Sequence, residues 1–285
     1  EQTGIEVNLI TGKASALMSR IKSEGEVSPA DLLITVDAGN LHRAKAEGLV
    51  QVIQSELLES AIPEVLRDPQ MHWVGLTRRA RTIFYAEDRV DPKLLSTYEN
   101  LVDDEWEGRI CIRSSSNIYN QSLVASLIEV HGEDATEAWA KGIVANMARK
   151  PTGGDTDQLR AVAAGQCDLA ISNTYYYGRL LDSERANDKK VVDTVKVFWL
   201  NQNDRGAHVN ISGAAIAKYA PNYDEAIKLL EFMVSEEVQS YYAEVNHEFP
   251  VVGSATVSAT IQSLGTFKSH DLNPVSYTHL TLPTM

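Results

Sequence analysis

Short apolar runs alternate with segments of helical spacing along the first part of the chain. The run ADLLITVD at 30–37 is continuously apolar, which is typical of a strand buried on both faces of a sheet. The segments on either side of this run, 13–25 and 38–49, show apolar positions at helical spacing, and each ends near a glycine. The pattern predicts strands at 5–10, 30–37 and 50–53 and helices at 13–25 and 38–49. Such βαβ alternation predicts helices flanking a mainly parallel sheet.

A second βα block lies between two long extended segments, at 72–88 and 195–217. The pattern within this block predicts strands at 109–115 and 167–173 and helices at 120–132, 133–147 and 156–165. A further helix is predicted after the second extended segment, at 224–245. The simplest topology is an α/β protein of two lobes joined by two crossing strands. Lobe 1 comprises 1–80 and 207–273, and lobe 2 comprises 81–206. Ligands of such sheets bind at the carboxyl ends of strands, here in a cleft that closes by a hinge motion.

Composition and charge narrow the range of partners. The chain has 285 residues and a formal net charge of −13, which argues against nucleic acid and against an anionic membrane surface. It has no continuous apolar run of the roughly 18 residues that a membrane span needs. Cys111 and Cys167 lack metal-site spacing, so we expect two buried unpaired thiols rather than a disulfide or a metal pair.

The segment ISNTYYYGRLL at 171–181 places three tyrosines where a buried strand meets a predicted helix. Tyr175 and Tyr176 fall in the first turn of that helix, where the helix dipole favours negative charge. Tyr119 also follows a strand end and precedes a helix, so it should lie at the same edge of the same lobe. Phenolate oxygens suit a hard cation such as Fe³⁺ better than zinc or copper. The alternative is that the tyrosines simply pack in a core.

Several long motifs resemble the ferric-iron-binding periplasmic proteins of bacterial ABC transporters. They are IKSEGEVSPADLLITVDAGNLHRAKAEGLVQ, TRRARTIFY, RSSSNIYNQSLVASL, NTYYYGRLL, HVNISGAAIAKYAPN and EFPVVGS, and the likeness covers residues 4 to about 273. The resemblance implies a two-lobed periplasmic-binding-protein fold and a receptor, not an enzyme. It implies a monomer in the periplasm that delivers iron to an ABC permease at the inner membrane.

The same resemblance implies the ligand set. Tyr119, Tyr175 and Tyr176 correspond to iron ligands, with carbonate, citrate or water completing the site, whereas Tyr177 faces packing or solvent. Family members carry one or two more ligands, a His or Tyr, near the mature N-terminus. We expect that segment to precede residue 1, so that the chain is truncated there and at its C-terminus, and we expect 274–285 to be a non-native tail.

Three arginines are candidates for stabilising phenolate or holding an anion. Arg179 lies four residues after Tyr175, with a surface ion pair to Asp182 or Glu184 as its alternative. Arg79 and Arg81 share one face of the first long extended segment, with packing in the hinge as their alternative. The glycine-rich segment 152–157 is interpreted as a capped turn rather than an anion cradle.

Two other functions use the same fold. One is a receptor for a small organic anion or polyamine, in which the tyrosines stack on the ligand. The other is an enzyme, for which the sequence shows no nucleophile with a partner base.

Overall fold

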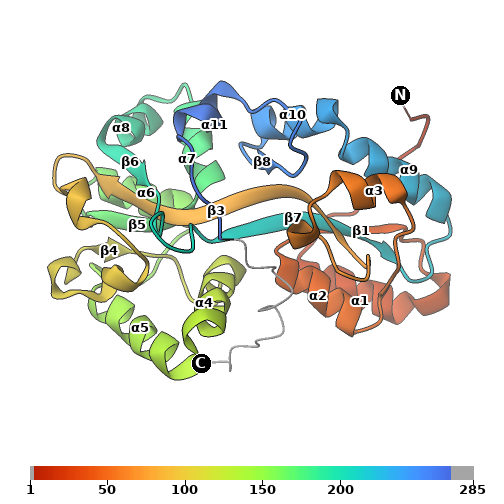
Figure 1. The fold of residues 1–285 in the computed structure, drawn as a ribbon, viewed down its shortest axis with the longest axis horizontal. Helices are drawn as coiled ribbons and strands as arrows, with labels where there is room; N and C mark the ends of the chain where they lie inside the picture. Colours follow the sequence, from red (N-terminus) through yellow and green to blue (C-terminus); the bar gives the residue numbers. More distant parts are fainter. Residues whose placement is uncertain (1–2, 271–285) are drawn as a thin grey trace.

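Two long antiparallel strands connect the two lobes of the protein (Figure 1). The computed structural model describes residues 3–270. Strand β3 (Val74–Ala86) passes from one lobe into the other, and its first half pairs with β7 (Val209–Ala217), which the chain enters as it returns from the other lobe. The predicted two-lobed α/β architecture with two crossing strands is confirmed.

Lobe 1 has one core built around the crossing strands. Its elements are α1 (Ala14–Glu24), β1 (Leu32–Val36), α2 (Ala38–Ala46), β2 (Val50–Gln51), α3 (Glu56–Ala61) and α9 (Tyr223–Met233). Leu33 and Leu41 pack there with Trp73 and Ile216. The strand expected at 5–10 is wrong: residues 4–13 have no regular structure, and no described strand pairs with them.

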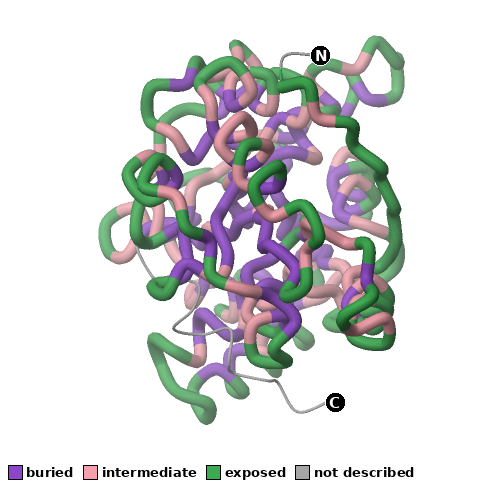
Figure 2. The backbone as a smooth tube through the Cα atoms, turned by 90° about the vertical axis from the view of Figure 1, so that its right-hand side faces the viewer, coloured by how far each residue is buried: buried purple, intermediate pink, exposed green. Residues whose placement is uncertain are grey.

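Lobe 2 has a core on each face of its sheet. Its elements are β4 (Ile110–Cys111), α4 (Ile118–His131), α5 (Glu133–Ala145), α6 (Asp155–Ala163), β5 (Leu169–Asn173), α7 (Thr174–Leu181), α8 (Ala186–Thr194) and β6 (Val195–Phe198). Successive strand residues point to opposite faces. Ile83 and Ile171 therefore pack against α4 and α5, while Phe84 and Ala170 pack against α6, α7 and α8. Figure 2 shows buried residues along the central strands and exposed residues on the outer surface.

The direction of strand pairing differs from the prediction of mainly parallel sheets. Among the described strands only β4 and β5 pair in parallel, and the other pairs are antiparallel. The physical reason is the position of β3 and β7. Each lies between strands of the βα units and runs against them, so strands with the same direction are separated by a crossing strand.

Two predicted elements are split in the structure. The extended segment at 195–217 forms β6 and β7 with a turn between them. The helix predicted at 224–245 forms α9 and then α10 (Glu236–Val245), because the Ser235 side chain accepts a hydrogen bond from the backbone N–H of Val238 and starts a new helix. The chain continues through β8 (Phe249–Pro250) and α11 (Ala259–Ser263).

Side chains at 243–264, a segment assigned to lobe 1, also pack into a core of lobe 2. The lobe boundaries at 80/81 and 206/207 stay predictions, and the tail at 274–285 lies outside the described residues. Within 3–270, no helix has the length and apolar character needed to cross a membrane.

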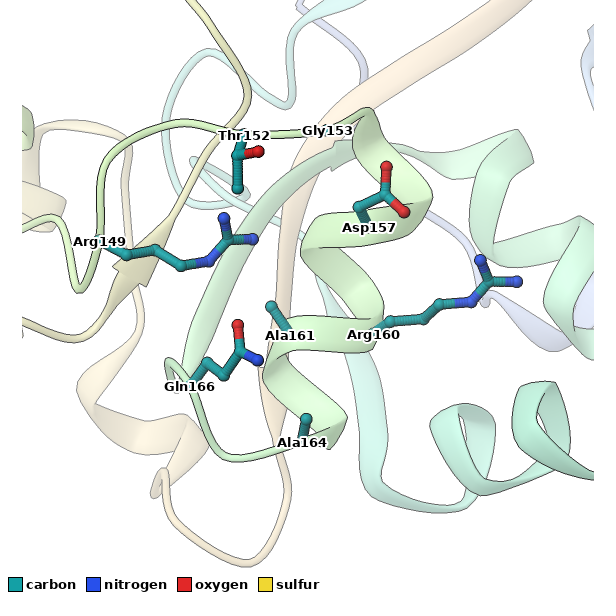
Figure 3. A pocket seen from close by; sticks show the side chains of 8 residues that line it. All are labelled: Arg149, Thr152, Gly153, Asp157, Arg160, Ala161, Ala164 and Gln166. Atoms are coloured by element: carbon teal, nitrogen blue, oxygen red, sulfur yellow. The ribbon is translucent and has the colours of Figure 1, made fainter.

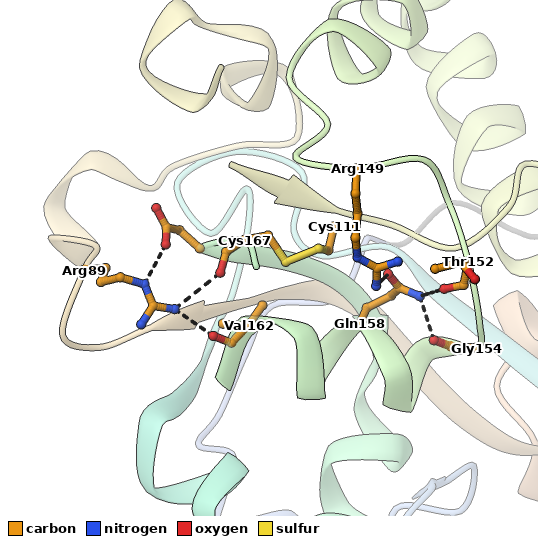
Figure 4. Close-up of a disulfide and its surroundings, with 9 residues drawn as sticks. Arg89, Cys111, Arg149, Thr152, Gly154, Gln158, Val162 and Cys167 are labelled. Atoms are coloured by element: carbon orange, nitrogen blue, oxygen red, sulfur yellow. Dashed lines mark hydrogen bonds and ion pairs between the residues drawn. A yellow bond between two sulfur atoms is a disulfide. The ribbon is translucent and has the colours of Figure 1, made fainter. Parts of the chain in front are cut away.

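The two cysteines form a disulfide, so the prediction of unpaired thiols is wrong (Figure 4). Cys111 ends β4, and Cys167 lies just before β5, with 5.9 Å between their Cα atoms. The two residues are 56 positions apart in sequence. They meet because β4 and β5 are neighbouring strands, with Ile110 opposite Leu169. Beside the bond, the Arg89 guanidinium donates hydrogen bonds to the carbonyls of Val162 and Cys167.

Candidate metal centre

The start of α7 places two tyrosines at the carboxyl end of a buried strand. All five residues of β5 are buried, and α7 begins at Thr174 directly after it. Tyr175 and Tyr176 therefore lie in the first helical turn, as predicted from the sequence. Their ring centroids are 4.2 Å apart. Tyr175 is buried, whereas Tyr176 is partly exposed.

The start of α4 brings the third tyrosine to the same place. The Asn117 side chain caps this helix by accepting a hydrogen bond from the Tyr119 N–H at 3.0 Å. The Tyr175 hydroxyl donates a hydrogen bond to the Tyr119 hydroxyl at 3.2 Å. Because β4 and β5 are parallel neighbours, the segments after their carboxyl ends meet at one edge of the sheet. The structure thus brings the three tyrosines together.

The surroundings of Tyr119 and Tyr175 favour the protonated form of these two phenols. Burial raises the pKa of Tyr175. The neighbouring Tyr119 and Tyr176 raise it further, because negative charge on their rings would repel a phenolate at Tyr175. Burial also raises the pKa of Tyr119, although its hydrogen bond with Tyr175 and the charge of Arg79 act in the opposite direction. Two phenol hydroxyls in contact with each other bind a hard cation as phenolates only by giving up protons.

Three guanidinium groups surround the phenols. Arg79 lies with its Cζ atom 5.3 Å from the centre of the Tyr119 ring, and Arg113 lies at 5.6 Å from it. Arg179 lies 5.0 Å from the Tyr175 ring and 5.8 Å from the Tyr176 ring. Among the described residues, Arg179 makes neither of the ion pairs considered from the sequence. Positive charge beside a phenol favours phenolate.

Arg79 has unused hydrogen-bonding capacity next to the phenols. Its side chain is buried, and Nη1 donates to the Ser212 hydroxyl at 2.7 Å. Nε and Nη2 have no hydrogen-bond partner. A buried N–H without a partner costs on the order of 1–3 kcal/mol, so two such groups on one guanidinium indicate a place for an anionic ligand.

Arg81 has a packing role in place of the predicted contact with an anion. Its Nε and Nη2 donate to Asn120 Oδ1, and its Nη1 donates to Asn173 and Asp155. The ion pair with Asp155 measures 3.0 Å and is fully buried. All three guanidinium nitrogens are therefore engaged within lobe 2. Arg81 thus joins Asn120, near the start of α4, to Asn173, the residue that precedes α7.

Tyr177 lies away from the other three rings. Its hydroxyl donates to the Val195 carbonyl at 2.6 Å, and its ring packs against Phe84. Burial raises its pKa to about 12. This is the packing position expected from the resemblance.

The glycine-rich segment forms a capped turn before α6, as interpreted from the sequence. The Asp157 carboxylate accepts a hydrogen bond from the Gly154 N–H at 2.7 Å. A surface hollow of about 390 Å³ lies beside this turn (Figure 3). Arg149 and Arg160 line it, but Arg149 is bonded to Gln158 and Arg160 to Asp188. The hollow lies apart from the tyrosines, which do not line it.

Two contributors to the site escaped the sequence analysis. Arg113 stands directly before the SSSNIYNQS motif, and its position at a strand end is the signal that could have identified it. Asp37 caps α2 by accepting a hydrogen bond from the Gly39 N–H, and it also contacts Ser122 of α4. Nothing in the local sequence indicates that second contact.

Within residues 3–270, no cluster of three or more His, Cys, Asp or Glu side chains could hold a metal ion.

Comparison with known proteins identifies the family. A family model described as bacterial extracellular solute-binding protein matches residues 28–274. The chain is 53% identical over 268 residues to iron uptake protein A1 of Synechocystis, covering 94% of this chain and 74% of that protein. It is 30% identical over 252 residues to the major ferric iron-binding protein of Neisseria meningitidis serogroup B, covering 87% of this chain and 74% of that protein.

Solved structures agree with these relatives. A Trichodesmium protein (IdiA, FutA) in complex with iron and citrate ligands is 50% identical and superposes with a TM-score of 0.95, covering 98% of this chain and 88% of that one. A ferric binding protein from Campylobacter jejuni is 40% identical and superposes with a TM-score of 0.93, covering 98% of this chain and 88% of that one. With its two lobes, crossing strands and matching sequence, this chain belongs to the bacterial extracellular solute-binding proteins.

Proposed function

We propose that the chain is a periplasmic receptor that binds ferric iron in the interlobe cleft and delivers it to an ABC permease at the inner membrane. Tyr119, Tyr175 and Tyr176 are the ligands, acting as phenolates. The observation that carries this proposal is the contact between the phenol oxygens of buried Tyr175 and partly buried Tyr119, 3.2 Å apart, with the Tyr176 ring tilted against that of Tyr175. Relatives named as iron uptake and ferric iron-binding proteins support it.

The chemistry at the site is coordination and proton exchange, without turnover. Fe³⁺ is a hard cation that prefers oxygen donors, and phenolate is an anionic oxygen donor. The metal replaces the phenolic protons and offsets the repulsion between neighbouring phenolates. Arg79, Arg113 and Arg179 add positive charge beside the rings and favour the deprotonated form further.

The disulfide supports an extracytoplasmic location. Disulfides persist in oxidising compartments such as the periplasm and are rare in the cytosol. The bond between Cys111 and Cys167 is therefore in keeping with a family of extracellular binding proteins. Proteins of this family work with ABC permeases, and we propose that this chain does so as a monomer.

Titration of the protein with ferric citrate, followed by visible absorption, tests the function. We expect a phenolate-to-iron charge-transfer band that saturates near one equivalent of iron. A folded protein that binds ferric citrate without such a band would contradict tyrosine ligation.

Arg79 is proposed to hold the anion that completes the iron site. Its Nε and Nη2 are free of protein partners, and a guanidinium can hold a carboxylate or carbonate with two parallel hydrogen bonds. Citrate, carbonate or water are the candidates for this position. The Trichodesmium structure with iron and citrate supports a carboxylate-bearing anion.

Replacing Arg79 by glutamine is expected to remove the dependence of iron retention on the anion. A charged hydrogen-bonded pair contributes about 1.5–3 kcal/mol, so iron retention at saturating citrate should fall roughly tenfold or more. The measurement is iron transfer to EDTA at increasing citrate concentrations. Arg78→Gln is the matched control, because Arg78 is the preceding residue on β3 and donates to the Pro250 carbonyl instead. An unchanged citrate dependence in Arg79→Gln would contradict the role.

Iron binding is expected to release at least two protons near neutral pH. Because the pKa values of Tyr119 and Tyr175 are raised, both phenols are protonated at pH 7, and both protons leave when iron binds. Apparent affinity should therefore rise with pH throughout the range below these pKa values. Titration at constant pH with added base measures the release, and Tyr119→Phe should reduce it by one proton per iron. Equal release from both proteins would show that the Tyr119 proton is not displaced.

A further inference from the structure

Asp37 is a buried carboxylate held in an unusual backbone conformation between the lobes. Its side chain is fully buried, and its φ angle is 76°, a value that non-glycine residues rarely adopt. Its N–H donates to the Ile211 carbonyl at 2.8 Å, and its Oδ1 accepts from the Gly39 N–H at 2.9 Å. Such strained residues persist where the surrounding structure requires them, often at functional sites.

The other oxygen of this carboxylate reaches across the lobe boundary. Oδ2 accepts a hydrogen bond from the Asn210 amide at 2.9 Å and one from the Ser122 hydroxyl at 2.6 Å. Asn210 belongs to β7 on the lobe 1 side, whereas Ser122 belongs to α4 of lobe 2. Ser122 lies three residues after Tyr119, so it is about one helical turn away on nearly the same face of α4.

These bonds differ in what they require of the lobes. The bonds to Gly39, Asn210 and Ile211 all lie within lobe 1 and its crossing strand, so they need no particular arrangement of the lobes. The bond to Ser122 joins α4 to the residue that caps α2, so it exists only while these two elements of different lobes lie close together. An interaction present in only one of two states stabilises that state alone.

Burying this carboxylate is costly, and its surroundings offset only part of that cost. Burial raises the pKa of Asp37, while the charge of Arg79 and the hydrogen bonds from Ser122 and Gly39 lower it. A charge-assisted hydrogen bond at such a site is stronger than one between neutral groups. Removing Ser122 would leave Oδ2 with one partner fewer inside the protein.

We propose that Asp37 is a latch: its hydrogen bond to Ser122 holds the first turns of α4, and with them Tyr119, against lobe 1 in the closed state and slows the release of bound iron. Asp37 is thus a positioning residue that acts through α4. The latch rests on the proposed iron function, since it assigns a role to closure around the metal.

Ser122→Ala tests the latch with minimal disturbance, because it removes only the hydroxyl on lobe 2. The iron-loaded protein is mixed with excess EDTA, and loss of the charge-transfer band is followed in time. We expect release roughly ten times faster than in the wild type, from the loss of one charge-assisted hydrogen bond. The matched control is Ser126→Ala on the same helix. Ser126 is also buried, and its hydroxyl bonds to the Leu123 carbonyl within α4, so release should be unchanged.

Two further measurements separate a latch from a general packing role. Thermal unfolding of iron-free Ser122→Ala should match the wild type, whereas the iron-loaded variant should melt at a lower temperature. Asp37→Asn should speed release in the wild-type background but add little in the Ser122→Ala background, because the two side chains act through one bond.

Each outcome has one meaning. Unchanged release from Ser122→Ala in the presence of a normal band would overturn the latch and leave the iron function intact. Equal loss of thermal stability with and without iron would also overturn it, since the bond would then be part of the resting core. Absence of the band in the wild type would contradict the proposed function instead.

Discussion

Replacing Tyr175 and Tyr176 together by phenylalanine is expected to abolish the phenolate-to-iron band and to lower affinity for ferric iron by a factor on the order of 10³ or more. The change removes two anionic oxygen donors while keeping both rings and their packing. Alteration of a residue that merely supports a metal ligand already costs roughly 10- to 100-fold in affinity, so loss of two ligands should cost more. Ferric citrate titration by visible absorption, with competition by EDTA, measures both quantities.

Tyr177→Phe is the matched control for this experiment. It makes the same chemical change on the next residue of α7, where the hydroxyl bonds to the Val195 carbonyl and not to the other tyrosines. The band should persist at full intensity in this variant. A band that survives in the Tyr175→Phe/Tyr176→Phe protein would show that these phenols are not ligands. An organic-anion receptor would then be the better description of the site.

Removing the disulfide by Cys111→Ser/Cys167→Ser is expected to lower the free energy of unfolding by about 4 kcal/mol. The bond closes a loop between positions 56 apart, and the chain-entropy relation for a loop of this length gives a value of about that size. For a chain of this length the melting temperature should fall by about 7 °C. Denaturant and thermal unfolding of the two proteins measure the difference.

Reduction of the wild type provides the control. Wild-type protein treated with a dithiol under denaturing conditions and then diluted into reductant should unfold like the double serine variant. Thiol titration of unreduced, denatured wild type should find no free thiol among its two cysteines. Two free thiols would contradict the disulfide.

Local patterns predicted the elements that carry the tyrosines. The fully apolar run before Asn173 forms β5, and the first turn of α7 follows it directly, because a buried strand and a helix start leave clear signals in sequence. The meeting of Tyr119 with Tyr175 was predictable from topology, since both follow neighbouring parallel strands. The long motifs added the family resemblance, which the comparisons confirm.

Contacts between distant segments were not predictable in the same way. Cys111 and Cys167 carry no spacing signal, and only the pairing of β4 with β5 brings them together. The side chains of Asp37 and Ser122 are 85 positions apart and meet across the lobes. Arg79 and Arg81 appear equivalent along the strand, yet the partners around them leave one with free N–H groups and the other with none. These differences depend on the neighbours that folding supplies.

The placement of all three tyrosines in lobe 2 has a consequence for the order of events. If these tyrosines bind ferric iron as proposed, one lobe can capture the ion before the lobes close, because none of the three phenols has to travel with lobe 1. Uptake then divides into a collision step, whose rate grows with iron concentration, and a first-order rearrangement, whose rate does not. On the same proposal, release follows these two steps in reverse order, so separation of the lobes precedes dissociation of the metal from lobe 2.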